Sequence, residues 1–282
     1  MISLYFQVVK KLAGHSQGTA SWSTNVGNEH GQVLMSVLTA SEGHGLEPMI
    51  QGLTKRYSTA GVPPPEILYV DRDCCTHSSL RKSFAAWPDL IIRLDIWHFM
   101  RRFASCVTTE AHPLYGVFMS RLARCIFQWS DEDLKLLKSA KRAELISQGL
   151  KSPSEEMVAS KLTKKELALH CRRSTRGKAA TTHAVYELLT TFTGDEGLDT
   201  VGTPLLDNER VWIEWDSQKK HIGCIQDPEG YQLYTVTGSL VKGGITLPTY
   251  RCARGTVSLE SFHLHLNRFI PGWYWPIYIY FI

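Results

Sequence analysis

The sequence predicts an α/β protein with a mixed β-sheet and a large, mainly helical insertion. Three observations lead to this fold class. Two β-rich runs between residues 18 and 39 are joined by a Gly- and Asn-rich turn, which is typical of a hairpin. Helices and strands then alternate over residues 45–103, and apolar residues recur at helical spacing from Pro113 to Leu205. A hairpin followed by such alternation favours a sheet with antiparallel and parallel strands.

The composition fits a globular protein and excludes several other classes. The chain has 282 residues, of which 43% are hydrophobic and 21% are charged, and its net charge is only +4. A nucleic-acid role would therefore need locally clustered Lys and Arg residues. Seven cysteines without a CxxC pair argue against a disulfide framework and favour the nucleus or the cytoplasm. No apolar run reaches the roughly 20 residues of a membrane helix, so we expect no membrane partner.

The first predicted helix covers residues 45–61. Its apolar residues recur every three or four positions from Leu46 to Tyr57, and it stops at Gly61 before three prolines. The next predicted elements are a strand at 66–73, a short helix at 79–87, a strand at 90–97 and a helix that starts at 98–103.

The insertion is predicted to contain five helical segments, many with acidic starts and basic ends. They are expected at residues 115–129, 131–149, 154–162, 163–178 and 182–192. The stretch 212–252 mixes strand-like and turn-like pieces. A last helix is predicted at 258–269, with one apolar and one polar face.

Two aspartates, Asp71 and Asp73, stand where the strand at residues 66–73 ends. Ligands gather at the carboxyl ends of strands in α/β sheets. Glu260 lies on the polar face of the last helix, where the helix dipole behind a Ser258 cap is its simplest structural explanation. Two carboxylates about 4 Å apart repel by roughly 4 kcal/mol at an effective dielectric near 20, so a cluster of them favours a hard cation.

Four stretches, taken in order, carry a family resemblance: ILYVDRDCC (67–75), RLDIWHFMRRFA (93–104), ALHCRRSTRG (168–177) and RCARGTVSLESFHLHLNRFIPG (251–272). Together with the order of elements they resemble the RNase H-like core of DDE transposases. The layout is similar to a transposon-derived family akin to the Mutator-like and Kyakuja-Dileera-Zisupton groups. The resemblance implies an RNase H-like core over residues 8–112, a mainly helical insertion over 113–250 and a final core helix over 251–272.

The resemblance also implies a chemistry and a set of site residues. The family's activity is metal-dependent cleavage and transfer of DNA strands, with Mg²⁺ or Mn²⁺ as cofactor, DNA as partner and a homo-oligomer as a possible assembly. By position, Asp71 would be the second acidic metal ligand, with Asp73 as the alternative, and Glu260 would be the third. Asp95 and His98, at the end of the next strand, would either assist the site or serve the structure.

A basic cluster is the candidate contact with nucleic acid. Arg172, Arg173, Arg176 and Lys178 follow one another closely and are suited to phosphate groups. The alternative is a basic helix end before Gly177, which would favour the helix dipole without binding anything.

The first acidic ligand is missing from its expected place. It should lie just ahead of Val8, in a segment that holds Asp-Ser-Thr in relatives, but residues 1–7 read MISLYFQ. We therefore expect the first core strand to be incomplete or missing and the chain to be inactive. Residues 1–7 and 273–282 are expected to be foreign to the domain, with an edge strand as the alternative for the second segment. The other function left open is a non-catalytic module that binds DNA or protein.

Overall fold

The computed structural model describes residues 2–5, 22–39, 45–75 and 79–269. It is a mixed α/β structure, as predicted, and divides into two compact units. The sheet unit comprises Met1–Phe99 with Arg254–Ile282, and the helical unit comprises Met100–Ala253. The sequence places the corresponding boundaries after residues 112 and 250. The segment 273–282 lies outside the described residues.

A five-stranded mixed sheet forms the centre of the sheet unit. Its strands are β1 (Ile2–Tyr5), β2 (Trp22–Gly27), β3 (Val33–Thr39), β4 (Ile67–Val70) and β5 (Ile91–Leu94). They lie in the order β3-β2-β1-β4-β5. Strand β2 runs antiparallel to β1 and β3, whereas β1, β4 and β5 are parallel. Part of the segment expected to be foreign thus forms a short strand at the centre of the sheet.

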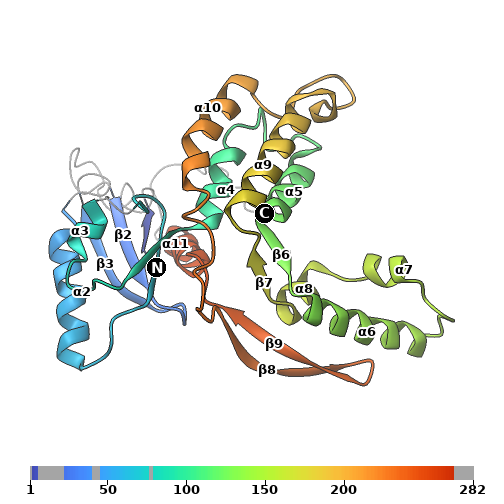
Figure 1. Ribbon diagram of the computed structural model, residues 1–282, viewed down its shortest axis with the longest axis horizontal. Coiled ribbons are helices and arrows are strands. Elements are labelled where there is room, and N and C mark those ends of the chain that lie inside the picture. Colours follow the sequence, from blue (N-terminus) through green and yellow to red (C-terminus); the bar gives the residue numbers. More distant parts are fainter. Residues whose placement is uncertain (1, 6–21, 40–44, 76–78, 270–282) are drawn as a thin grey trace. The chain divides into compact units, whose positions relative to one another are not determined.

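Helices cover both faces of this sheet. The helices of the sheet unit are α2 (Glu47–Ala60), α3 (Ser79–Ser83), the start of α4 (Ile96–Ala104) and α11 (Val257–Phe269). Met35 of β3 pairs with Val26 of β2, and its Cε atom lies 3.6 Å from the Cβ position of Gly52 in α2. The neighbouring Asn25 points to the other face, because side chains alternate along a strand, and it contacts His263 of α11. Helices α2 and α11 therefore lie on opposite faces (Figure 1).

The helical unit contains some strand, as predicted, but two of its strands lie where the sequence predicts helix. Its helices are α5 (Tyr115–Ile126), α6 (Asp131–Ser147), α7 (Glu155–Ser160), α8 (Lys164–His170), α9 (Lys178–Thr193) and α10 (Asn208–Gln218). Its strands are β6 (Phe127–Trp129), β7 (Arg173–Thr175), β8 (Tyr234–Lys242) and β9 (Ile245–Cys252). Two expected helices, 115–129 and 163–178, therefore end early. Their last parts pair as β6 and β7, which satisfies the backbone groups that helix formation would otherwise satisfy.

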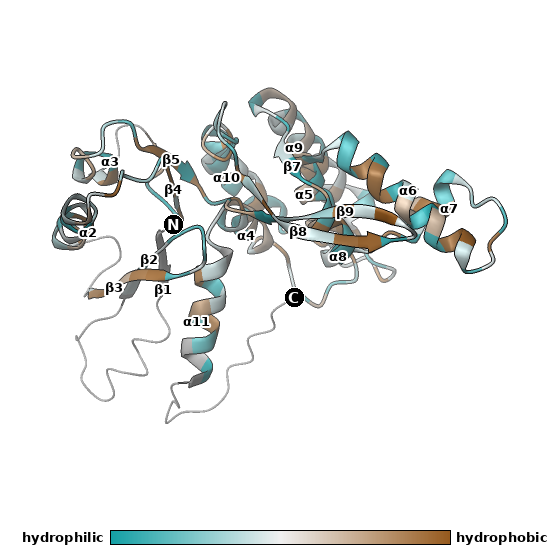
Figure 2. Ribbon diagram, turned by 90° about the horizontal axis from the view of Figure 1, so that it is seen from below, coloured by the Kyte–Doolittle hydropathy of each residue, from teal (hydrophilic) through white to brown (hydrophobic). Residues whose placement is uncertain are grey.

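Two apolar clusters stabilise the helical unit. Helices α5 and α9 lie side by side (Figure 1), and the rings of Phe118 and Phe192 meet edge to face at 5.4 Å between centroids. The second cluster joins α6 to the β8–β9 hairpin through the fully buried Leu137, Ala140 and Leu247. Figure 2 shows the alternation of hydrophobic and hydrophilic residues along α6 that allows this packing.

Two further expectations concern cysteines and membrane helices. All seven cysteines lie in the described part of the chain, and none of them forms a disulfide. Among the described residues, no helix combines the length and the hydrophobicity that crossing a bilayer requires.

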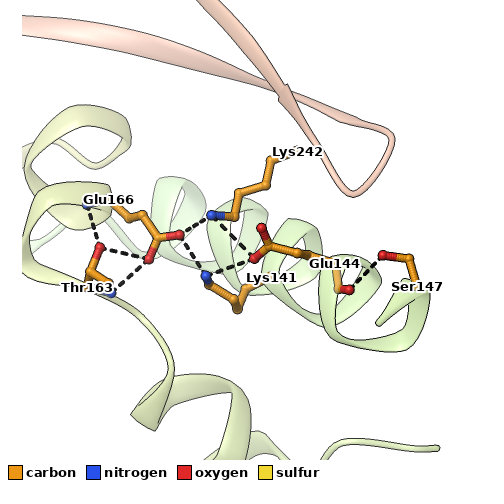
Figure 3. A network of polar contacts seen from close by, with 6 residues as sticks. All are labelled: Lys141, Glu144, Ser147, Thr163, Glu166 and Lys242. Atoms are coloured by element: carbon orange, nitrogen blue, oxygen red, sulfur yellow. Dashed lines mark hydrogen bonds and ion pairs between the residues drawn. The ribbon is translucent and has the colours of Figure 1, made fainter. Parts of the chain in front are cut away.

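A network of four charged side chains joins the hairpin to the helices. Lys141 of α6 lies 2.8 Å from Glu144 and 2.7 Å from Glu166 of α8, and Lys242 at the end of β8 contacts both carboxylates (Figure 3). The hairpin turn approaches α6 closely, because a Cβ atom on Gly243 would lie 2.6 Å from the Ala140 carbonyl oxygen. Burial raises the pKa of Glu166, but hydrogen bonds from both lysines outweigh it and lower the pKa to about 2.

Replacing Glu166 should weaken the helical unit. Glu166→Gln leaves two ammonium groups without one counter-charge, so we expect a loss of about 1 to 3 kcal/mol in the free energy of unfolding at pH 7, measured with urea. The loss should shrink as the pH falls from about 4.5 toward 2, because a carboxylate with a lowered folded-state pKa stabilises above its unfolded-state pKa. Glu187→Gln, at an exposed position of α9, is the control. Equal losses in both variants would contradict the role of the network.

Candidate functional site

Three side chains from distant parts of the sequence meet in the sheet unit. Asp71 directly follows β4, His98 lies in the first turn of α4, and Glu260 lies in the first turn of α11. The Nε2 atom of His98 is 3.1 Å from Asp71 Oδ1 and 3.3 Å from Glu260 Oε1. The three side chains are only 11% to 22% exposed, so their charges are weakly screened by water. The structure thus places one imidazole between the two predicted carboxylate ligands.

The carboxylate of Asp95 bonds the starts of the two helices that carry His98 and Glu260. Its side chain is fully buried, and Oδ1 accepts a 2.9 Å hydrogen bond from the backbone N–H of His98. This contact caps the start of α4. The other oxygen, Oδ2, accepts a 2.8 Å bond from the N–H of Thr256, the residue before α11. The carboxylate of Asp95 therefore positions the helices that carry His98 and Glu260, and its contacts are those of a structural role.

A glycine makes the contact with Asp95 possible. Gly255 has a φ of 83°, in the left-handed region, and a Cβ atom there would lie 2.7 Å from Asp95 Oδ2. Any other residue would meet both backbone strain and a collision with the carboxylate. Gly255 is therefore part of the construction of the site.

A second buried polar contact joins α11 to β2 near Glu260. His263, one turn after Glu260, is buried against β2, and its Nε2 atom lies 2.8 Å from the amide nitrogen of Asn25. Because an amide nitrogen only donates, Nε2 accepts and the ring proton is on Nδ1. That atom lies 3.8 Å from Glu260 Oε2. This pair was not predicted from the sequence. Its signal is a run of three consecutive polar residues inside a β-rich segment, Ser23 to Asn25, which indicates a polar partner on the helix that covers them.

Asp71 and Asp73 have different surroundings. Asp71 contacts His98, whereas Asp73 is exposed, has a φ of 57° and lies 3.5 Å from the Nε atom of its neighbour Arg72. Of the two aspartates that end this strand, the structure brings Asp71 to the site.

Strand β1 occupies the place expected for the first acidic ligand. Ile2 pairs with Val70, the last residue of β4, so the next residue of β1, Ser3, is level with Asp71. On its other side Ser3 pairs with Asn25. Residues 2–5 of β1 contain no acidic residue. At this level of the sheet β1 supplies a serine and no carboxylate.

The donor set fits one cation better than two. Two carboxylates balance the charge of a single divalent ion. A pair of Mg²⁺ ions needs a further carboxylate to bridge them, and β1 does not provide it.

The predicted basic cluster is largely engaged inside the helical unit. The guanidinium group of Arg172 binds Asp133 at 2.8 and 2.9 Å, and that of Arg173 lies 4.1 Å from the centroid of the Phe127 ring. Arg176 Nε donates to the backbone carbonyls of Arg124 and Phe127. These contacts hold β6, β7 and α6 together. Lys178, exposed at the start of α9, is the remaining member.

The charges around His98 determine its protonation. Burial lowers the pKa of His98, but the hydrogen bond with Glu260 and the negative charges of Asp71, Asp95 and Glu260 outweigh it, so the pKa is raised above its ordinary value of 6.5. His98 therefore keeps its proton to a higher pH than an exposed histidine. Its contribution to stability is complete below the unfolded-state pKa and is lost as the pH rises through the folded-state pKa.

Comparison with known proteins gives no match: no protein-family model, no curated protein and no solved structure is significantly similar to this chain. The function must therefore be inferred from the arrangement of its own residues. In the sheet unit this arrangement is two carboxylates around one imidazole, held by a buried aspartate and a buried Asn–His pair.

Substituting Gly255 tests the construction of the site. Gly255→Ala should lower the free energy of unfolding of the sheet unit by about 2 to 4 kcal/mol, because it adds a collision with Asp95 to the backbone strain. Gly61→Ala is the matched control, since Gly61 also has a positive φ, of 63°, but nothing lies within 4 Å of its Cβ position. We expect about 1 kcal/mol there. Equal losses of unfolding free energy in the two variants would show that the close contact of Gly255 with Asp95 does not contribute to the effect.

An NMR titration of the His98 ring tests the electrostatics. The midpoint should lie above 6.5 in the native protein and should fall in Glu260→Gln, because the largest favourable contact with the imidazolium is then removed. Glu47→Gln, at an exposed position of α2, should leave the midpoint unchanged. A midpoint below 6.5 in the native protein would mean that burial outweighs the carboxylates.

Proposed function

We propose that this chain is a transposase-derived protein with an RNase H-like core, whose ancestral activity was metal-dependent cleavage and transfer of DNA strands. In its present form the chain lacks that activity. The observation that carries the proposal is the convergence of Asp71 and Glu260, from β4 and α11, on the same nitrogen of His98. Two carboxylates from elements so distant in sequence share one partner, and carboxylates gathered in this way favour a divalent cation.

The order of elements supports the RNase H-like assignment. A three-stranded antiparallel part, β3-β2-β1, continues into the parallel strands β4 and β5, and the Glu-bearing helix packs on this sheet. The helical unit, Met100–Ala253, is inserted between β5 and α11. This succession is what the resemblance to DDE transposases implies.

The chemistry of this chain follows from its own residues. Asp71 and Glu260 would hold a divalent cation, which in such enzymes activates a water or a 3′-hydroxyl group. Asp95 positions the helices that carry His98 and Glu260. Without an acid on β1, the negative charge at the site is too small for the pair of cations that strand transfer requires.

A non-catalytic binding module is the second candidate. The lack of an acid on β1 favours it. The internal contacts of Arg172, Arg173 and Arg176 leave less basic surface for DNA than the sequence predicts. A retained role in DNA binding would then rest on other basic residues, and protein binding becomes the main alternative. Either role fits the predicted location in the nucleus or the cytoplasm.

The absence of an acid on β1 can be tested by adding one. We expect the native chain to leave supercoiled plasmid intact in Mg²⁺ or Mn²⁺, and Ser3→Asp to introduce nicks, because Ser3 is level with Asp71 on the neighbouring strand. Ser3→Asn is the uncharged control, and Asp71→Asn added to Ser3→Asp should remove the nicking. Nicking by the native chain that Asp71→Asn abolishes would refute the loss of activity. A folded Ser3→Asp variant without nicking would count against the assigned site.

A further inference from the structure

The β8–β9 hairpin of the helical unit has one closed edge and one open edge. We propose that the open edge, on β8, pairs in antiparallel orientation with β8 of a second copy of the chain and so forms a dimer. The pairing continues the two-stranded sheet across a two-fold axis. None of the residues that carry this inference belongs to the sheet unit, so it does not depend on the proposed function.

The outer edge of β9 is closed. Pro248 lies within β9 and pairs with Ser239, although proline has no N–H group to donate. The ladder continues on both sides of this pair, so Pro248 turns its nitrogen and its carbonyl group away from β8. The carbonyl oxygen accepts a 2.8 Å hydrogen bond from Nδ1 of His170 in α8. A proline and a helix therefore protect this edge from further pairing.

The opposite edge of the hairpin, on β8, is open. Because Ser239 and Pro248 form a pair without hydrogen bonds between them, Ser239 points its own N–H and C=O groups outward. Val241, two residues further on, does the same. No strand among the described residues pairs with this side of β8, and the residues from Thr235 to Val241 are exposed. Figure 1 shows β8 on the side of the hairpin away from α8.

Strand β8 lacks the features that usually protect an exposed edge. Residues Thr235–Val241 contain no charge and no proline. Lys242 is the one charged residue of β8, but its ammonium group is bound by the two glutamates of the charged network. The β-bulge of this strand lies at Val236, before the open stretch. Natural proteins protect such edges with charges, prolines or bulges, so an unprotected edge indicates a partner strand.

The open edge is complementary to itself. In the antiparallel dimer Ser239 faces Val241 of the second copy, and each such pair exchanges two hydrogen bonds. Leu240 then lies opposite Leu240 of the second copy at a non-hydrogen-bonded position, where side chains are closest. Leu240 is 52% exposed although its partner on β9 is the buried Leu247, which packs on α6. The second copy extends this apolar row with its own leucine, which an unrelated peptide would have to supply.

Sedimentation equilibrium of the full chain tests the dimer. The paired stretch is short, so we expect a dissociation constant of about 1 to 100 µM. Leu240→Lys should raise this constant at least tenfold, because two like charges then lie opposite each other. Ile213→Lys, at an exposed position of α10, is the control and should leave it unchanged. Val241→Pro should also weaken the dimer, because it removes an outward N–H group and leaves the bonds to β9 intact.

A mixture of two variants tests the register. Leu240→Lys and Leu240→Glu should each weaken the dimer, and an equal mixture should restore it, because opposite charges then face each other across the two-fold axis. Circular dichroism checks that each variant is folded. A mixture that associates no better than either variant, or equal effects of Leu240→Lys and Ile213→Lys, would overturn the inference. So would a native chain that stays monomeric over this concentration range, which would leave the edge to an extended segment of another protein.

Discussion

The buried carboxylate of Asp95 joins two helix starts that are far apart in the sequence, and the geometry of the sheet unit depends on it. A buried negative charge is costly unless it is bonded, and here each oxygen accepts one backbone N–H group. One bond directs α4 away from the end of β5, and the other fixes the entry into α11. His98 and Glu260 face each other because both helices begin at the same carboxylate. At position 255 only glycine allows the backbone to lie this close to the Asp95 carboxylate.

The site combines burial with a cluster of negative charges, and burial normally makes such a cluster unfavourable. Its carboxylates are largely buried, so they repel each other unless a positive charge lies between them. The imidazolium of His98 provides that charge in the protein alone, which is why its pKa is raised against the effect of burial. A metal ion would provide the same charge.

In the helical unit, charged residues serve mainly to connect elements. Lys141 and Lys242 bind Glu144 and Glu166 between the helices and the hairpin, as Figure 3 shows. Arg172 binds Asp133; burial raises the pKa of this aspartate, but the hydrogen bonds outweigh it and lower the pKa. Because these cations already have anionic or aromatic partners, a basic cluster in the sequence is a weak guide to a nucleic-acid surface.

The sequence by itself determined the features that depend on neighbouring residues. The apolar run before Asp71 gives a buried strand, the spacing from Leu46 to Tyr57 gives α2, and the two-faced pattern around Glu260 gives α11. These follow from local propensity and periodicity. Only the tertiary structure decided the features that depend on pairing between distant segments. The formation of β6 and β7, the engagement of Arg172 by Asp133 and the contact of Asn25 with His263 belong to this group. So do the double role of Asp95 and the level of Ser3 in the sheet, because a hydrogen bond or a strand register between distant residues leaves no periodic signal in either segment.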